Sequence, residues 1–353
     1  MVDFNLTEQQ EMLVELAREF ADDELIPNAE KWDTEGTFPK EAIDKAREMG
    51  LLNCTIPEAY GGMGLSFLEE AMINEELGRG DPGFATITGV TMLACHPVIF
   101  AGTDEQKAEY LGRVANGEIS AYCVTEPGAG SDVKSISTTA VLEGDNYVIN
   151  GAKMWIGGAG YADWFYVLAR TDDKDSYDSF SGFIVEADSA GLEVGKKENK
   201  MGQRCSDTRG VRFHNVKVPK ENLLGGKEGG GWLQAMVAFD RCRPMLSSHA
   251  LGNARGAMEE AWQYSNERMT FGKPIFEHQS ISFMLADMST KIECARLLTY
   301  KAANLLDKGE RATLESAHAK RYAADIGMEV TTDAVQIFGG YGYSEEFPAA
   351  RRM

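Results

Sequence analysis

The order in which hydrophobic periodicities change along the chain most constrains its fold. Apolar residues recur at helical spacing in the first third, for example from Met12 to Ala21. Short strand-like runs separated by turn residues follow, and three long helical runs come last. This segregation argues against a doubly wound α/β sheet, in which strands and helices would alternate. The prediction is an α+β fold, mostly α, with an N-terminal helical domain at 1–118, a central antiparallel β-domain at 119–226 and a C-terminal helical domain at 227–353.

Local signals support this division. Thr7–Gln10 is a capping-box pattern at the start of the first apolar run, and Pro27 is expected to end that run. Further helices are predicted over 68–77 and 103–115. The turn sequence 143–146 lies between two strand-forming segments, which predicts a hairpin. Other strands are predicted over 164–169, 183–186 and 211–218, a flexible glycine-rich linker over 225–231, and the last helices over 233–268, 280–306 and 314–338.

Charge and cysteine usage exclude several classes of protein. The formal net charge is −20, and such a field repels nucleic acid and anionic membrane surfaces, so neither is an expected partner. An anionic ligand would need a local cluster of Arg and Lys. The six cysteines form no C-x-x-C pair, which argues against a secreted disulfide framework. The five histidines have no metal-ligand spacing, so no metal site is predicted.

The sequence also bears on location. Residues 1–5 lack the basic and apolar regions of a signal peptide, and the chain has no run of eighteen apolar residues. No membrane span is expected. A cytoplasmic protein is favoured over a mitochondrial matrix protein whose leader has been removed.

Two motifs in the middle part could hold a cofactor. The first, 122–133, follows a predicted strand, and its small residues would let a planar ring approach the backbone. A Rossmann fingerprint is excluded because the third glycine is Val133 and no helix is predicted to follow. From this stretch alone an ordinary β-turn is favoured. The second motif, 153–158, places Trp155 beside a glycine pair, and a core tryptophan explains it equally well.

Three further motifs lie at or within the last helices. The segment 239–244 carries an Asp and two Arg that could hold amide and phosphate groups, although a solvated helix face with an Asp–Arg pair is the better explanation in isolation. The segments 268–273 and 336–342 end long helices in glycine-containing turns, which normally are C-caps but could also cradle a nucleotide. The G-x-S-x-G and P-loop patterns are absent from the sequence.

Together and in this order, these motifs resemble the acyl-CoA dehydrogenase family over the whole chain. The run 123–132 matches the family's first signature, and 201–209 is most similar to the medium-chain branch. His278 and Gln279 also fall where the family has them, as do 268–272 and 336–342. The resemblance implies an N-terminal helical domain, a central β-domain and a C-terminal four-helix domain.

The resemblance also implies an activity. It is the FAD-dependent conversion of a saturated short-to-medium-chain acyl-CoA to the trans-2-enoyl-CoA, a step of fatty acid β-oxidation. A carboxylate removes the α-proton while the β-hydride moves to the flavin, and developing enolate charge is stabilised. Electrons then pass to an electron-transfer flavoprotein. The expected assembly is a homotetramer, or dimer of dimers, in which FAD is shared between subunits.

Site residues carry over from the family position by position. The flavin is expected to contact Tyr122, Val124, Thr125, Gly130, Ser131, Trp155, Ile156 and Gly157. The FAD of a neighbouring subunit is expected to contact Arg268, Thr270, Phe271, Gln336, Ile337, Gly339 and Gly340, and His278 and Gln279 are also expected to bind the cofactor. The CoA chain is expected to contact Ser131, Asp240, Arg243, Arg311 and Thr313.

The sequence departs from the family pattern at two places. Gly157 stands where the family usually has Thr or Ser, whose hydroxyl contacts the flavin near its reactive nitrogen. In the medium-chain branch the catalytic base is a Glu on the C-terminal side of Met353, so the catalytic residue is expected beyond this chain. Another branch places the base where this sequence has Cys242, and an unactivated thiol cannot replace a carboxylate there. Glu345 and Glu346 do not match the base motif.

Two alternatives remain beside the dehydrogenase. A flavin-dependent enoyl-CoA reductase would share every motif and differ only in the direction of the reaction. A protein that binds FAD and CoA without turnover would result if the encoded chain ended at Met353.

Overall fold

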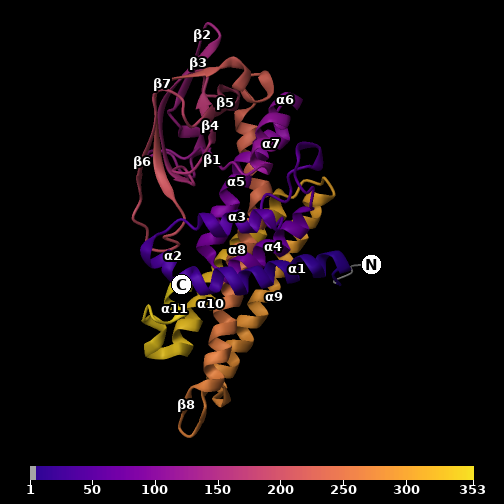
Figure 1. Cartoon of the computed structure of the whole chain (residues 1–353), viewed down its shortest axis with the longest axis vertical. Coiled ribbons are helices and arrows are strands. Elements are labelled where there is room, and N and C mark those ends of the chain that lie inside the picture. The colour runs from indigo at the N-terminus through magenta and orange to yellow at the C-terminus, as the bar shows by residue number, and fades with distance from the viewer. Residues whose placement is uncertain (1–4) are drawn as a thin grey trace.

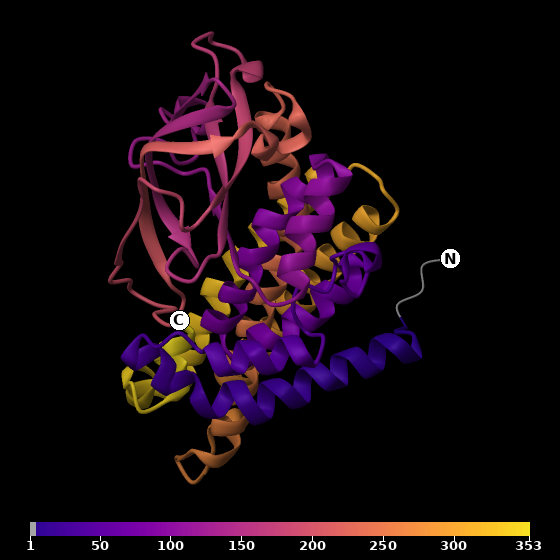
Figure 2. The ribbon, with the colours of Figure 1, turned by 45° about the horizontal axis from the view of Figure 1, so that its top comes forward.

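The computed structural model describes residues 5–353, so the start of the chain, on which the expectation about a signal peptide partly rests, lies outside the described residues. In both views the sheet stands at one end of the molecule and the short β8 hairpin marks the other (Figures 1 and 2). The long helix α8 runs through the middle and contacts elements of all three parts of the chain.

The N-terminal part is helical, as predicted. Its elements are α1 (Glu8–Phe20), η1 (Ala21–Leu25), α2 (Ile26–Glu35), α3 (Lys40–Glu48), η2 (Glu58–Tyr60), α4 (Phe67–Gly80), α5 (Pro82–Ala101), α6 (Asp104–Gln106), η3 (Lys107–Leu111) and α7 (Gly112–Ala115). The capping box predicted at Thr7 is present, because its hydroxyl accepts from the N–H of Gln10 and the Gln10 side chain accepts from the N–H of Thr7.

The expectation that Pro27 ends the first helical run was wrong. The wide turn η1 follows α1, and there the N–H of Ile26 bonds to the carbonyl of Ala21, five residues back. The helix α2 then continues with Pro27 in its first turn. A proline is tolerated in that position because its missing N–H would have no partner within the helix.

The middle part forms the predicted β-domain. Within the described residues one seven-stranded sheet contains β1 (Ser120–Cys123), β2 (Thr139–Glu143), β3 (Asn146–Gly157), β4 (Trp164–Arg170), β5 (Phe180–Glu186), β6 (Leu192–Lys197) and β7 (Thr208–Pro219). The predicted hairpin joins β2 to β3, with Glu143 opposite Asn146. Most neighbouring strands are antiparallel, and β4 additionally pairs in parallel with β1 and β2.

The C-terminal part follows the sheet through η6 (Lys220–Asn222) and η7 (Leu224–Gly226). Its elements are α8 (Gly231–Glu267), β8 (Met269–Thr270), β9 (Lys273–Pro274), η8 (Ile275–Glu277), α9 (Gln279–Asp307), α10 (Thr313–Phe338), η9 (Gly339–Tyr343) and α11 (Pro348–Arg352). The three predicted long helices agree with α8, α9 and α10 to within two residues at each end. Buried Leu, Ile, Val and Ala side chains from these helices form a core of their own.

The glycine-rich segment 225–231 is not the open linker that its composition predicted. The N–H of Gly225 donates to the side-chain oxygen of Gln106 at 3.0 Å. A Cβ atom at Gly231 would lie only 2.6 Å from the backbone of Ser181. Glycine at position 231 therefore permits close packing of the start of α8 against the sheet.

The helix α5 was absent from the sequence predictions. Within residues 5–353 it is the one helix long and apolar enough to meet the length and composition of a membrane span. Two thirds of its most apolar window is buried inside the protein, as in an ordinary core helix. It joins the hydrophobic core that links β1, β4 and β5 to α8, and this position brings α5 to the candidate site.

Candidate active site

A cavity of about 300 Å³ lies where the sheet meets α5 and α8. Five of the residues expected to contact a flavin border it: Tyr122, Thr125, Trp155, Ile156 and Gly157. Tyr122 belongs to β1 and Thr125 to the turn after it, and the other three end β3. Two distant sequence motifs thus meet at one cavity of a size typical of small-molecule sites.

Other residues expected at the flavin lie elsewhere. The side chain of Val124 is buried in the core, and Gly130 and Ser131 lie in the exposed part of the loop. None of these three borders the cavity.

Seven lining residues were missed by the sequence analysis. They are Thr86, Val90, Leu93, Lys200, Ser206, Thr208 and Phe239. The first three repeat at intervals of four and three residues and so form one face of α5. Ser206, Thr208 and Phe239 lie within motifs quoted for the resemblance, and that proximity was the available signal for them.

Trp155 is held in an unusual backbone conformation. Its φ is 63°, in the left-handed region that a bulky residue rarely adopts, and it lies at a bulge of β3 against β7. Its side chain is 59% exposed although it borders the cavity. Strain of this kind clusters at functional sites, and here it directs a large aromatic ring to the rim of a cavity instead of into the core.

Glu126 anchors the loop that follows β1. One of its oxygens accepts from the N–H and hydroxyl of Ser137, and the other accepts from the N–H and hydroxyl of Thr138 and from Lys153 Nζ at 2.9 Å. Burial opposes ionisation of Glu126, but Lys153 and these hydrogen bonds outweigh it and lower the pKa of the carboxyl to about 2. Lys153 also donates to the carbonyl of Val124. The ion pair therefore fixes the loop that carries Thr125.

A charged cluster begins on α8 directly after the cavity residue Phe239. Arg243 donates to Asp240 Oδ1 at 2.7 Å, and the hydroxyl of Thr313 donates to Asp240 Oδ2 at 2.6 Å. Arg311 Nε donates to the Thr313 hydroxyl at 3.4 Å. The four residues expected to contact CoA besides Ser131 thus come together from α8 and from the start of α10.

The remaining predicted residues gather near the β8–β9 hairpin, which Figure 1 places at the opposite end of the molecule from the sheet. The Thr270 hydroxyl and His278 Nε2 lie 3.1 Å apart, and Phe271 at the turn is 97% exposed. The Arg268 guanidinium carbon lies 5.9 Å from the centroid of the Tyr341 ring, so the hairpin contacts η9, which follows α10. None of these residues borders the cavity of their own chain.

The predicted residues at the end of α10 differ in exposure. The side chain of Ile337 packs in the core of the C-terminal helices. Gly339 and Gly340 face open space, since a Cβ atom at either would meet nothing within 4 Å. Gln336 and Gln279 make no hydrogen bond within the described chain through their side chains, which leaves both amides free for a ligand.

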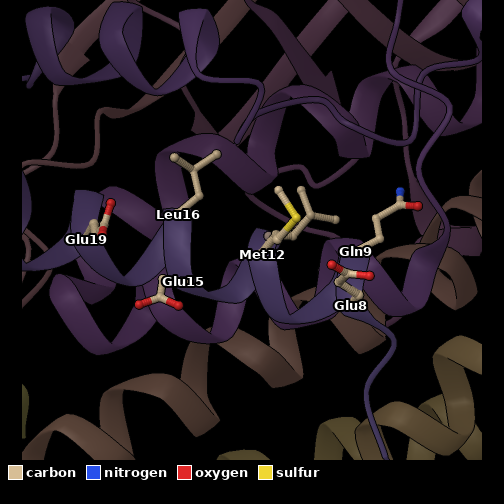
Figure 3. Close-up of a pocket in the computed structure, with 7 residues that line it drawn as sticks. Glu8, Gln9, Met12, Glu15, Leu16 and Glu19 are labelled. Atoms are coloured by element: carbon tan, nitrogen blue, oxygen red, sulfur yellow. The ribbon is translucent and has the colours of Figure 1, made fainter.

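A larger hollow of about 600 Å³ lies on the surface of α1 and is unrelated to this site (Figure 3). Among the described residues, its lining comes from that one helix and includes Glu8, Glu15 and Glu19 but no basic side chain. An acidic wall of this kind does not suit the phosphates of a nucleotide.

Candidate catalytic groups near the cavity are few. Cys242 is buried, and burial raises the pKa of its thiol to about 12, so it stays protonated at neutral pH. Glu345 and Glu346 are exposed and do not border the cavity. Within residues 5–353 no group of three or more His, Cys, Asp or Glu side chains is arranged to hold a metal ion.

Known proteins resemble this chain over nearly its whole length. A probable medium-chain specific acyl-CoA dehydrogenase 2 of Caenorhabditis briggsae, described as mitochondrial, is 42% identical over 99% of this chain and 86% of its own. A short-chain specific acyl-CoA dehydrogenase of Clostridium acetobutylicum is 42% identical over 100% of this chain and 93% of its own. An acryloyl-CoA reductase (NADH) of Anaerotignum propionicum is 42% identical over 99% and 89%.

Solved structures share the fold. Butyryl-CoA dehydrogenase from Megasphaera elsdenii superposes with a TM-score of 0.97 at 42% identity, covering 100% of this chain and 93% of that one. A chain of a structure described as "Electron transferring flavoprotein of Acidaminococcus fermentans: Towards a mechanism of flavin-based electron bifurcation" has a TM-score of 0.97 at 45% identity, with the same coverage.

The domain matches follow the order of the three structural parts. Family models for the acyl-CoA dehydrogenase N-terminal, middle and C-terminal domains match residues 7–118, 121–216 and 229–353. The predicted three-part fold is the fold of this family. The chain therefore belongs to the acyl-CoA dehydrogenase family of FAD-dependent oxidoreductases.

Proposed function

We propose that the protein dehydrogenates a short-to-medium-chain acyl-CoA to the trans-2-enoyl-CoA and passes the electrons to an electron-transfer flavoprotein. One observation carries this proposal. Phe239 borders the cavity, while its neighbour Asp240 and Arg243 one turn on belong to the charged cluster. Adjacent residues of α8 thus connect a ring-sized cavity with groups that can bind a nucleotide, as a CoA thioester lying beside a flavin requires.

The residues present fit the isoalloxazine of FAD. The cavity has aromatic and aliphatic walls from Tyr122, Trp155, Phe239 and Leu93, and hydroxyls from Thr125, Thr208, Ser206 and Thr86. The rings of Tyr122 and Tyr166 are stacked with their centroids 5.1 Å apart, and Tyr122 lies edge-on to Phe239, so this wall is rigid. A flat apolar slot with a few fixed polar groups is the usual design of a cofactor site.

The chain's own residues would bind and orient the substrate. A bound flavin supplies the acceptor for the hydride that leaves the β-carbon. Arg243 and Arg311 would hold phosphate oxygens of CoA, and Asp240 keeps Arg243 in place. The apolar wall around Phe239 and Leu93 excludes water from the reacting carbons. Within residues 5–353 we assign no base for the α-proton.

We infer that a neighbouring subunit of a homotetramer completes the FAD-binding site. A 97% exposed Phe271 beside Arg268, His278 and open glycines is unusual for a surface that faces water. These residues do not border the cavity of their own chain, and the β8 hairpin lies at the opposite end of the molecule from the sheet (Figure 1). A second copy that presents its cavity to the hairpin would bury the aromatic ring and place Arg268 near the nucleotide.

The relatives support the substrate class, the acceptor and the location. A butyryl-CoA dehydrogenase and short-chain enzymes match this chain over its full length, which favours short straight acyl chains. The structure described as an electron-transferring flavoprotein contains a chain that is 45% identical, which favours that acceptor. Bacterial relatives favour the cytoplasm.

The second candidate is a flavin-dependent enoyl-CoA reductase. The acryloyl-CoA reductase of Anaerotignum propionicum is as similar to this chain as the dehydrogenases are, and it is named for the opposite direction of the reaction. Both directions use the same contacts to FAD and CoA, so the redox potential of the flavin would decide between them.

An anaerobic titration tests the proposal. We expect purified protein to hold FAD and butyryl-CoA to bleach the oxidised flavin absorbance, with octanoyl-CoA less effective. Reoxidation by electron-transfer flavoprotein would complete the cycle. A flavin that butyryl-CoA leaves oxidised, while NADH and acryloyl-CoA drive turnover, would replace the dehydrogenase with the reductase. Protein without FAD would overturn both.

A further inference from the structure

We propose that Lys200 is the electrostatic partner of the cofactor, and that its ammonium group stabilises the negative charge that the flavin gains on reduction. This inference rests on the proposed placement of FAD in the cavity between the sheet and α5. It adds a residue to which the sequence motifs assigned no role.

Among the residues that the structure describes, Lys200 is the one charged side chain that borders the cavity. The other lining residues are aromatic, aliphatic, glycine or hydroxyl-bearing. Lys200 and Ser206 lie in the loop between β6 and β7, and Thr208 is the first residue of β7. The loop therefore forms the wall opposite Val90 and Thr86 of α5, and Lys200 gives this wall its full positive charge.

The ammonium of Lys200 has no carboxylate partner within residues 5–353. The acidic groups that act on it are Asp33 and Asp207, and each already binds an arginine: Asp33 accepts from Arg204 at 2.7 Å, and Asp207 accepts from Arg209 at 2.8 Å. Lys200 is nevertheless half-buried, and burial lowers the pKa of its ammonium. A protein with a net charge of −20 has many carboxylates that could pair with it, yet this one cation is left unpaired at a cavity.

The remaining charged neighbour does not change this picture. Lys197 donates to the carbonyl of Gly36 and adds a second positive charge nearby. Cys205 is buried, and its thiol stays neutral because burial raises its pKa. The cavity wall is therefore locally positive before any ligand binds.

A positive charge at the wall has a defined effect on a flavin. Charge placed near the ring nitrogens tunes the potential of a bound flavin. Because the flavin becomes more negative when it accepts a hydride, Lys200 must favour the reduced form over the oxidised form.

The test compares Lys200→Gln with Lys200→Arg and with Lys196→Gln. Lys196 is exposed on β6 and does not border the cavity, so its replacement removes the same charge without touching the site. The first quantity measured is the ratio of the dissociation constants for oxidised and reduced FAD. The midpoint potential of the bound flavin, measured against a reference dye, checks this ratio independently. This ratio can be measured even in a variant that binds FAD weakly.

We expect Lys200→Gln to shift the ratio by about tenfold against reduced FAD, a fall of ~30 mV for a two-electron couple. Lys200→Arg and Lys196→Gln should stay close to the wild type. Equal weakening of both redox forms in Lys200→Gln would mean that Lys200 only attracts the nucleotide, and an unchanged ratio would mean that it is only solvated; either result overturns the inference. Wild-type protein that binds neither form would instead refute the placement of FAD.

Discussion

The Cγ2 atom of Val90 lies 2.8 Å from the position that a Cβ atom at Gly157 would occupy. Carbon atoms in contact are normally about 3.5–4.0 Å apart, so a side chain at position 157 and a valine at position 90 exclude each other. Both residues border the cavity. Hydrocarbon from α5 therefore occupies the space that a side chain at position 157 would need.

Gly157→Thr should therefore lower stability and FAD affinity, because overpacking of this kind typically costs about 1–3 kcal/mol. Val90→Ala removes the obstructing methyl groups, since the Val90 Cβ atom itself lies 3.8 Å from the added Cβ. The double variant should recover most of the loss. Thermal unfolding and FAD dissociation constants check this. A Gly157→Thr protein as stable as the wild type, with FAD bound as tightly, would contradict the steric explanation.

Arg243→Ala should raise the KM for acyl-CoA about tenfold and change kcat little, because a charge-assisted contact to the nucleotide end of the substrate is worth about 1.5 kcal/mol or more. An acyl-pantetheine substrate, which has no nucleotide, should not distinguish the variant from the wild type. Arg321→Ala is the matched control, since Arg321 is an exposed arginine on α10. Equal losses with both substrates would mean that Arg243 supports the fold of α8 instead of binding CoA.

The elements with a clear period were predictable from the sequence, and α5 was not. The hairpin between β2 and β3 and the helices α8 to α10 follow their hydrophobic patterns and turn residues. The helix α5 is buried on nearly all of its faces, so apolar and small residues occur on all of its sides and no amphipathic period remains. The turn η1 similarly shows no sequence signal by which Pro27 could be placed inside a helical run.

The site residues likewise fall into those that the sequence predicted and those that it did not. Tyr122 and Trp155 belong to motifs, and the resemblance paired Asp240 with Thr313 although they are 73 residues apart. Val90 and Lys200 lie in segments where no motif marks them. Only the packing of α5 and of the β6–β7 loop against the sheet brings them to the cavity. The spacing of residues within either segment does not predict this packing.

Lys153→Met should destabilise the protein by about 3–5 kcal/mol, because it leaves the buried carboxylate of Glu126 without its cation. The double variant with Glu126→Gln should be less destabilised, since no buried charge remains. Denaturant unfolding with an unchanged m-value measures both effects. FAD affinity should fall together with stability, because Glu126 fixes the loop that carries Thr125. Additive effects of the two substitutions would show that the pair does not act as a unit.

Glu70→Gln should remove part of the pH dependence of stability. Glu70 is buried in α4, and within residues 5–353 its carboxyl accepts one hydrogen bond, from the Thr55 hydroxyl at 3.3 Å. Burial raises the pKa of this carboxyl from 4.5 to about 7, with a smaller contribution from Asp307. The neighbouring thiols of Cys54 and Cys242 stay neutral because burial raises their pKa.

The sign of the effect follows from where the proton is bound. Between pH 4.5 and about 7 the folded protein keeps the proton on Glu70, while the unfolded chain has lost it. The stabilisation is therefore complete below pH 4.5 and is lost as the pH rises through about 7, a change of about 3 kcal/mol. Glutamine is neutral throughout, so the advantage of Glu70→Gln over the wild type should grow by that amount between pH 5 and pH 8. Glu19→Gln on the exposed face of α1 makes the same change and should not reproduce it. Parallel stability curves for wild type and Glu70→Gln would show that Glu70 ionises in the folded protein as it does in the unfolded chain.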